Sequence, residues 1–235
     1  MQLSKRLAAV AAFIPSGCVV ADIGTDHADL PIYLVKNKIC PRVIAVENKR
    51  GPWLRARANI ESCGLQGYID LRLGDGLQVL RPGEAQVLVL AGIGCLTIQQ
   101  VLAAGQDVWW SAHRLVIQPQ NKWQELRLWL SAAGWRLTGE DLIYEGRHFY
   151  AVMALEPGPS PPYSSLEWEL GPLLVARRHP LLLALVEKKI KKLEIIKRNL
   201  AGSHRPSLND RVQEIGEKLL QLEEIRQWLQ NARKS

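Results

Sequence analysis

The chain has 235 residues, of which 47% are hydrophobic and 23% charged, so its composition fits a globular protein and excludes a disordered or fibrous one. No apolar run approaches the roughly 20 residues that cross a bilayer, and we expect a cytoplasmic protein without a membrane anchor. The net charge of +7 permits an anionic partner, and most of the excess lies in residues 160–235, with 14 Lys and Arg against 9 Asp and Glu.

The first predicted element is an amphipathic helix within residues 1–14. Leu3, Leu7 and Val10 recur there at helical spacing. No small-residue cleavage site follows the short apolar stretch, so the segment does not fit a signal peptide. We therefore expect a helix that caps the domain.

From residue 18 to about residue 157, β-branched apolar runs alternate with helical patterns. The predicted strands are 19–23, 42–47, 69–73, 86–91 and 114–118, and the predicted helices are 30–37, 51–63, a segment through Ile98 and Leu102, and 123–133. This alternation predicts an α/β fold with a parallel, doubly wound sheet. Two last strands, 135–144 and 148–155, lie close enough to pair as a hairpin. A mostly parallel sheet that ends in a hairpin is typical of class I methyltransferases.

A proline-rich segment at 157–164 interrupts this pattern, because it can continue neither a strand nor a helix. We therefore predict a first domain at 1–157 and a second at 158–235.

In the second domain, apolar residues recur every three or four positions over 182–200 and again over 208–229, with a break at 202–206. The pattern predicts an antiparallel α-helical coiled-coil hairpin, an arm too thin to hold an active site of its own. Its positive charge suits contacts with nucleic-acid phosphates, although most charge runs are simply solvated helix faces. The candidate nucleic-acid-binding residues are Arg177, Arg178, Lys188, Lys191, Lys192, Lys197 and Arg198.

The four cysteines, Cys18, Cys40, Cys63 and Cys95, are too far apart in sequence for a zinc knuckle or a redox pair. Free cysteine packs well as a small hydrophobic residue. We expect reduced thiols and no bound metal.

Acids or glycines follow four successive predicted strands, where the carboxyl ends of a parallel sheet form a ligand-binding edge. The turn after the first strand has one glycine and several acids, which suits a cofactor with ribose and a positive charge better than one with a pyrophosphate. An acid at the end of the second strand usually accepts hydrogen bonds from ribose hydroxyls. These features indicate S-adenosylmethionine. The candidate cofactor-binding residues are Asp22, Gly24, Thr25, Glu47, Asn48, Gly74, Asp75, Gly76, Ala91, Gly92, Ile93 and Gly94.

Four stretches, 21–28, 74–77, 91–94 and 118–119, resemble the bacterial tRNA (adenine(22)-N1)-methyltransferases known as TrmK, in the same order along almost the whole chain. The resemblance implies a Rossmann-like class I methyltransferase domain followed by a helical coiled-coil domain. It also implies transfer of a methyl group from S-adenosylmethionine to N1 of an adenine in tRNA. Two positions depart from the family pattern, which has a tyrosine where this chain has Asp29 and a glycine pair where it has Gly94-Cys95.

Methylation at N1 leaves a cationic adenine that must lose a proton, and a carboxylate can stabilise that charge or accept the proton. Asp26 is the candidate for this role, with His27 as a helper. The alternatives are that Asp26 caps the following helix and that His27 packs structurally. Gln118 precedes a proline at the position where amino-group methyltransferases carry an Asn/Asp-Pro-Pro-aromatic motif. It is therefore a candidate for hydrogen bonding to the base.

Two rival functions remain open at this point. One is a class I methyltransferase for a small molecule or a protein, with the coiled coil serving dimerisation. The other is a non-catalytic RNA-binding relative whose pocket is impaired by Asp29 and Cys95. We expect tRNA as the partner, no contact with a membrane, and a monomer or weak dimer.

Overall fold

The computed structural model describes residues 2–201 and 209–231. The chain divides into two compact units, Met1–Pro162 and Tyr163–Ser235. The division falls inside the proline-rich segment 157–164, whose prolines lack the backbone N–H that a continuing strand or helix needs.

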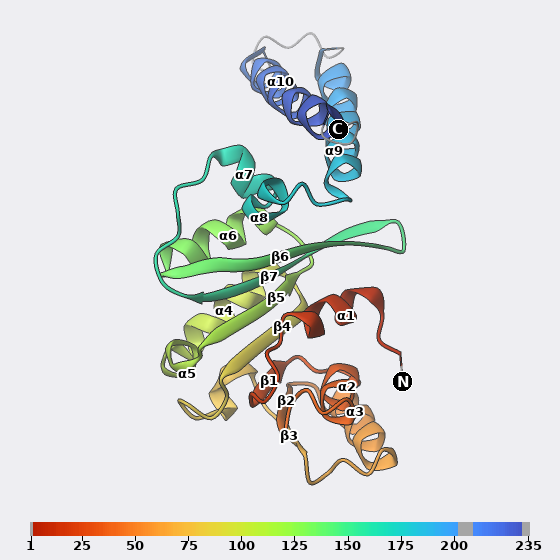
Figure 1. Ribbon diagram of the computed structural model, residues 1–235, viewed down its shortest axis with the longest axis vertical. Coiled ribbons are helices and arrows are strands. Elements are labelled where there is room, and N and C mark those ends of the chain that lie inside the picture. The colour runs from red at the N-terminus through yellow and green to blue at the C-terminus, as the bar shows by residue number, and fades with distance from the viewer. Residues whose placement is uncertain (1, 202–208, 232–235) are drawn as a thin grey trace. The chain divides into compact units, whose positions relative to one another are not determined.

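The first unit is built on a seven-stranded sheet in the order β3-β2-β1-β4-β5-β7-β6 (Figure 1). Its strands are β1 (Val20–Ile23), β2 (Val43–Glu47), β3 (Ile69–Leu73), β4 (Val87–Ile93), β5 (Arg114–Pro119), β6 (Trp135–Glu145) and β7 (His148–Pro157). The first five strands are parallel, and β7 runs antiparallel to both β5 and β6. The predicted parallel sheet with a closing hairpin is confirmed, and each strand end lies within two residues of its predicted position.

Helices cover both faces of this sheet, which is why the central strands are apolar at nearly every position. They are α1 (Lys5–Ala12), α2 (Asp29–Lys36), α3 (Arg50–Ser62), the 3₁₀ helix η1 (Gly76–Val79), α4 (Cys95–Ala104), α5 (Gln106–Ser111) and α6 (Trp123–Ala132). Val10 of α1 and Leu34 of α2 share one buried core cluster with Val20 and Val87 of the sheet. The prediction missed η1 and α5, which are too short to show a helical period.

The first helix is fixed to the sheet by contacts with the distant hairpin. The backbone N–H of Lys5 donates to Oε1 of Glu145 at 2.9 Å. Phe13, which ends α1, packs over Gly139 of β6 so closely that a Cβ at that glycine would overlap the phenyl ring. The predicted N-terminal helix is therefore present, and its position depends on residues more than 120 positions later.

The described residues of the second unit form helices and no strands: α7 (Ser165–Leu170), α8 (Pro172–Ala176), α9 (Leu182–Ala201) and α10 (Asn209–Asn231). Helix α7 starts with a capping box between Ser164 and Glu167. Helices α9 and α10 pack against each other, and Leu182, Val186 and Ile190 are buried as their spacing predicts. The predicted break at 202–206 lies outside the described residues. Helices α7 and α8 were not predicted, because each spans fewer than two turns.

Across residues 2–201 and 209–231, no helix has both the length and the apolar composition that a membrane-spanning segment needs. The four cysteines are free thiols, with Cys40 and Cys95 buried and Cys18 and Cys63 partly buried.

Candidate active site

The turn after β1 has an unusual backbone conformation. Gly24 has a φ of 76°, and two residues with side chains, Asp26 (φ 49°) and Ala28 (φ 60°), also adopt the left-handed region. Residues with side chains in this region cost free energy, and they occur in tight turns as well as at functional sites. The turn is held to β2, because the N–H groups of Gly24 and Thr25 both donate to the carbonyl of Val46, at 2.9 and 3.0 Å.

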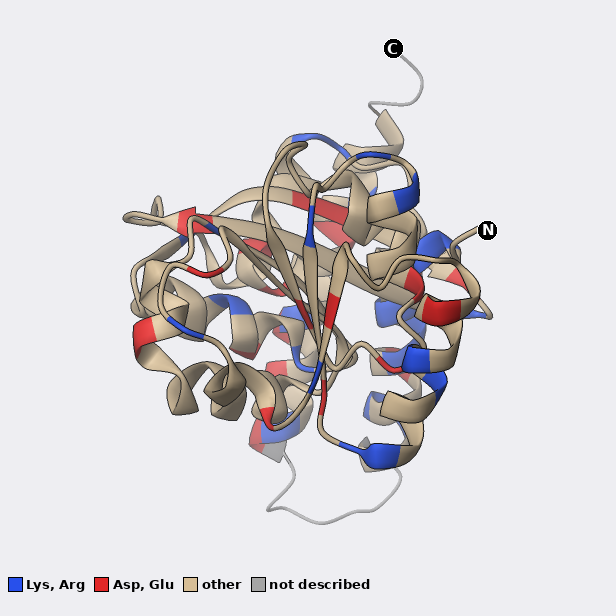
Figure 2. Cartoon of the chain, turned by 90° about the horizontal axis from the view of Figure 1, so that it is seen from below, with Lys and Arg blue, Asp and Glu red and all other residues tan. Residues whose placement is uncertain are grey.

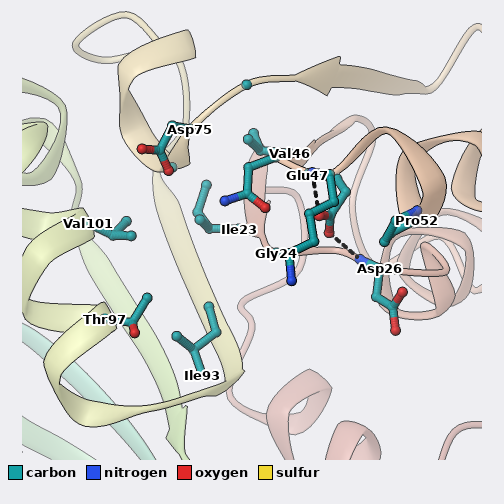
Figure 3. A pocket seen from close by; sticks show the side chains of 14 residues that line it. Ile23, Gly24, Asp26, Val46, Glu47, Pro52, Asp75, Ile93, Thr97 and Val101 are labelled. Atoms are coloured by element: carbon teal, nitrogen blue, oxygen red, sulfur yellow. Dashed lines mark hydrogen bonds between the residues drawn. The ribbon is translucent and has the colours of Figure 1, made fainter.

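A cavity of about 430 Å³, called the first cavity below, opens at the carboxyl ends of β1 to β4 (Figure 3). This is the place where the strand order reverses, between β1 and β4, and where α/β sheets bind their ligands. The lining residues that the sequence predicted for a cofactor are Gly24, Glu47, Asn48, Gly74, Asp75, Gly76 and Ile93.

Glu47 projects into the first cavity from the end of β2 with its carboxylate held by backbone donors. Its Oε2 accepts from the N–H of Asp26 at 3.2 Å, and its Oε1 accepts from the N–H of Lys49 at 2.9 Å (dashed in Figure 3). The side chain is only 6% exposed. A carboxylate fixed in this way keeps lone pairs available for hydroxyl groups of a ligand.

The glycines of the 74–76 turn allow close packing around Asp75. A Cβ at Gly76 would lie 2.9 Å from Cγ1 of Val101, and a Cβ at Gly74 would overlap the side chain of Val79. Asp75 itself is exposed and lines the cavity, so its carboxylate can meet a ligand.

A second cavity, of about 280 Å³, adjoins the first and shares Gly24 and Asp26 with it. Its remaining lining residues are Arg6, Leu7, Asp22, Thr25, His27, Asp29, Leu30, Ala91, Gly92 and Gln120. The two cavities together contain every predicted cofactor residue except Gly94, which is instead the N-cap of α4.

Asp22 is the most deeply placed acid of the second cavity, with 5% exposure. Burial raises the pKa of its carboxyl to about 6, and the nearby Glu47 carboxylate adds to the increase. A carboxyl in this state ionises readily when a cation is placed beside it.

Gln118, predicted to meet the substrate base, is completely buried and lines neither cavity. Its Oε1 accepts from Nη1 of Arg6 at 2.7 Å and from the N–H of Gly92 at 3.1 Å. Its Nε2 donates to the carbonyl of Pro119 at 2.9 Å. The amide therefore binds other groups of the protein. One of them, Arg6, lines the second cavity.

Asp26 and His27 lie at the surface of the turn. The Asp26 carboxylate is 3.4 Å from Nη2 of Arg55 and 3.6 Å from Nε2 of His27. Helix α2 begins at an N-cap, Ala28, without a side-chain hydrogen bond, so Asp26 does not cap it. His27 is exposed rather than packed in the core. Neither of the structural alternatives for these two residues is observed.

The two positions that depart from the family pattern have different surroundings. Asp29 is the first residue of α2 and lines the second cavity. Cys95 is buried at the start of α4, and its N–H donates to Oδ1 of Asn121 at 3.1 Å. Burial raises the pKa of the Cys95 thiol, which makes it an unreactive packing residue. Of the two, only Asp29 faces a ligand-sized space.

Several lining residues were not predicted, chiefly Arg6 and Gln120 in the second cavity and Lys49 and Thr97 in the first. Arg6 is 112 residues away from its partner Gln118, and nothing in its local sequence marks it as part of a site. Within the described ranges, no group of three or more His, Cys, Asp or Glu side chains could hold a metal ion.

In the second unit, six of the seven predicted nucleic-acid-binding residues are exposed, and Lys197 is partly buried. The Arg178 guanidinium lies over the Trp228 ring, 4.5 Å from its centroid. Acidic as well as basic positions occur on many elements of the chain (Figure 2).

Comparisons with known proteins agree with this geometry. A methyltransferase domain family matches residues 3–153. The Bacillus subtilis tRNA (adenine(22)-N(1))-methyltransferase is 41% identical over 158 residues, which cover 67% of this chain and 66% of that protein. The crystal structure of the B. subtilis M1A22 tRNA methyltransferase TrmK superposes with a TM-score of 0.86 at 32% identity, covering 96% of this chain and 99% of that one. A Streptococcus pneumoniae structure in complex with S-adenosyl-L-methionine superposes with a TM-score of 0.86 at 30% identity, covering 96% of this chain and 100% of that one.

Proposed function

Because this chain belongs to the tRNA (adenine(22)-N1)-methyltransferase family, we propose that it transfers a methyl group from S-adenosylmethionine to N1 of adenine 22 in tRNA. The observation that carries the proposal is the pair of adjoining cavities at the switch point of the sheet, which meet at Gly24 and Asp26. One cavity suits an adenosine, and the other provides charged groups next to it.

The residues of both cavities fit the cofactor. The fixed Glu47 carboxylate would accept hydrogen bonds from the ribose hydroxyls, and Asp75 would accept one from the adenine amine. The buried Asp22 carboxyl would pair with the α-ammonium group. When bound, S-adenosylmethionine supplies a methyl group on a positively charged sulfur, which a ring nitrogen can accept.

Asp26 would act on the substrate base, a role supported by its position in the lining of both cavities and by its exposed carboxylate. The adenine N1 lone pair needs no strong base, so positioning contributes most to the rate. Once N1 is methylated the ring is cationic, and Asp26 would stabilise that charge and accept the proton that the ring loses, with His27 beside it. Gln118 would act indirectly, because its hydrogen bonds hold Arg6 and Gly92 in position.

A base in folded tRNA is stacked and must be turned out before it can react, which requires a grip on the backbone. The exposed cations of the second unit would supply part of that grip through phosphate contacts. We propose that the enzyme acts in the cytoplasm, where a tRNA substrate would be available, as a monomer or weak dimer.

Methyl transfer to defined tRNAs tests the proposal. The protein is incubated with methyl-labelled S-adenosylmethionine and unmodified tRNA, or with the same tRNA carrying guanine at position 22. Label is expected in the first RNA only, and nuclease digestion should yield N1-methyladenosine. Transfer to protein or small molecules instead, or equal labelling of both RNAs, would contradict the proposal.

A further inference from the structure

The hairpin of β6 and β7 extends past the rest of the sheet (Figure 1). Strand β7 pairs with β5 over three positions, the last of which sets Met153 opposite Ile117. Strand β5 ends two residues later at Pro119, whereas β6 and β7 stay paired with each other up to their turn. We call residues 144–150 the hairpin tip. In the described part of the chain no further strand lies beside this tip, which reaches roughly 10 Å beyond β5 at about 3.3 Å per residue.

The hairpin tip lies at the same edge of the sheet as the second cavity. That cavity is lined by Gln120, which directly follows β5, and by Arg6 and Leu7 of α1. The hairpin contacts both of these elements, since β7 pairs with β5 and Oε1 of Glu145 accepts from the backbone N–H of Lys5 at 2.9 Å. A molecule as large as tRNA that brings a base to this cavity therefore comes within reach of the tip.

Helix α1 packs on one face of the hairpin and keeps it in place. Ile143 of β6 and Val152 of β7 are buried in the same core cluster as Val10 of α1. Side chains alternate between the two faces of a strand, so Tyr144 and its cross-strand partner Phe149 lie on the opposite face. A two-stranded hairpin alone is only marginally stable in water, and the packing on α1 supplies the support that it needs.

The turn at the end of the hairpin is tight. Its two central residues, Gly146 and Arg147, have φ values of 55° and 68°, as a type I′ turn requires. Arginine rarely adopts this region, and here it is exposed at the outermost point of the hairpin. The tip is therefore a fixed structure that carries a positive charge, rather than a long loop.

Four of the seven residues of the hairpin tip carry planar rings: Tyr144, His148, Phe149 and Tyr150. The rings of Tyr144 and Phe149 have centroids 4.9 Å apart and an interplanar angle of 50°. Cross-strand packing of this kind stabilises a hairpin and accounts for that contact. It does not account for the exposure of Tyr144, at 45%, and of His148 on the other face.

We propose that the hairpin tip binds tRNA next to the target adenine, with the exposed rings of Tyr144 and His148 stacking on unpaired bases. The proposal rests on the proposed function, since it takes tRNA as the substrate. Proteins recognise unpaired RNA bases largely by stacking them on aromatic side chains and on arginine. An adenine that leaves its stack also uncovers the faces of its neighbours. The two rings lie on opposite faces of the hairpin, so a base can stack on each.

Binding of unmodified tRNA to ring variants tests the proposal. Tyr144→Val keeps a residue that favours strands but removes the ring, and it should weaken binding roughly 5- to 100-fold. Tyr144→Phe keeps the ring and should stay within about twofold of wild type. The matched control is Tyr68→Val, because Tyr68 is 54% exposed and precedes β3 at the opposite edge of the sheet. It should leave the affinity unchanged in filter binding.

The salt dependence separates stacking from phosphate contacts. A stacked base releases no counterions, so the slope of log affinity against log salt should be the same for Tyr144→Val and wild type. His148→Val should also lower the affinity. Unchanged affinity in both variants would overturn the proposal. A changed slope in Tyr144→Val, or an equal loss in Tyr144→Phe and Tyr144→Val, would overturn it as well.

Two further measurements keep the test decisive if Tyr144→Val does not fold. Calorimetry with S-adenosylmethionine identifies a misfolded variant, because every folded one should bind the cofactor as wild type does. Hydrogen exchange needs only the wild-type protein, in which the amides of the hairpin tip should exchange more slowly once tRNA is added. Absence of that protection rejects the proposal. Failure of the wild-type protein to bind or methylate any tRNA would instead contradict the proposed function itself.

Discussion

The turn after β1 and the helices of the second unit use charge in opposite ways. Beside the turn, Asp22 is buried at the end of β1, and Glu47 is buried at the end of β2 with its carboxylate held by backbone donors. On α9, the cations Lys188, Lys191 and Lys192 are exposed to water. Interactions in a buried site are strong and specific, whereas exposed charges are screened by salt and act together. Single substitutions should therefore decide the function of the turn, and only the summed charge should matter on the helix.

The largest effect of a single substitution is expected at Asp26. Asp26→Asn should lower the rate of methyl transfer roughly 10²- to 10⁴-fold, because the amide cannot accept the proton of the methylated ring. Single-turnover assays with saturating cofactor measure this rate. The matched control is Glu61→Gln, since Glu61 is another acid paired with an arginine of α3 but lies outside both cavities. An unchanged rate would show that Asp26 only organises the turn.

Next in size is the effect of reversing two exposed charges on α9. Lys191→Glu combined with Lys192→Glu should weaken tRNA binding about tenfold or more and reduce the slope of log affinity against log salt by about 1 to 2. Filter binding at several salt concentrations measures both quantities. Glu194→Gln, which removes an exposed negative charge from the same helix, should have the opposite sign. Equal affinities for all three proteins would mean that this helix does not touch the RNA.

The third prediction is that cofactor affinity depends on pH through the Asp22 carboxyl. Because burial raises the pKa of its carboxyl to about 6, cofactor affinity should be constant above that pH and fall by up to about tenfold per unit below it. The reason is that the ammonium pairs with the ionised form. Titration calorimetry between pH 5 and 8 measures the dependence, which Asp22→Asn should abolish.

The same carboxyl should cost stability in the free protein. Its pKa is higher in the folded state than in the unfolded state, so this carboxyl costs no stability at low pH, and its cost is complete above about pH 6. Asp22→Asn should therefore raise the free energy of unfolding at pH 7 by about 3 kcal/mol. Chemical denaturation would refute this reading if the variant were less stable than the wild type.

The smallest effect concerns a pair of lysines in the second unit. Nζ of Lys189 and Nζ of Lys218 lie 2.8 and 2.5 Å from the Glu169 carboxylate. Burial opposes ionisation of Glu169, but the two lysines outweigh it and hold the pKa of Glu169 below its usual value. Glu169→Gln should cost about 1 to 2 kcal/mol of stability at neutral pH. The difference from wild type should shrink as the pH falls below the unfolded pKa of Glu169 and vanish below its lower folded pKa. Glu224→Gln, at an exposed position, is the control for thermal unfolding.

Most of the first unit could be predicted because its sequence pattern is local. Buried strands such as Val43–Glu47 are continuous apolar runs, and the acids that end them meet at one edge by the geometry of a parallel sheet. This is why the sequence alone could place Asp22, Glu47 and Asp75 at the same edge of the sheet. Short helices such as Pro172–Ala176 could not be predicted, because fewer than two turns give no period.

The second cavity contains residues that the local sequence pattern could not predict. Arg6 looks like an ordinary surface residue of an amphipathic helix, and only the tertiary fold brings it to Gln118. Gln118 in turn was predicted to meet the substrate base, yet it is buried, with its amide oxygen bound to Arg6 and Gly92 and one amide N–H bound to Pro119. Pairings across more than a hundred residues carry no signal in a single sequence.

The attachment of α1 to the last hairpin also sets the order in which the two cavities can form during synthesis. The first cavity needs only residues up to Val101, all of which leave the ribosome early. Helix α1 emerges before any strand, but its contacts with Gln118, Gly139 and Glu145 must wait for the end of the sheet. During synthesis, all residues that line the first cavity are therefore made before the three residues that fix α1 beside the second.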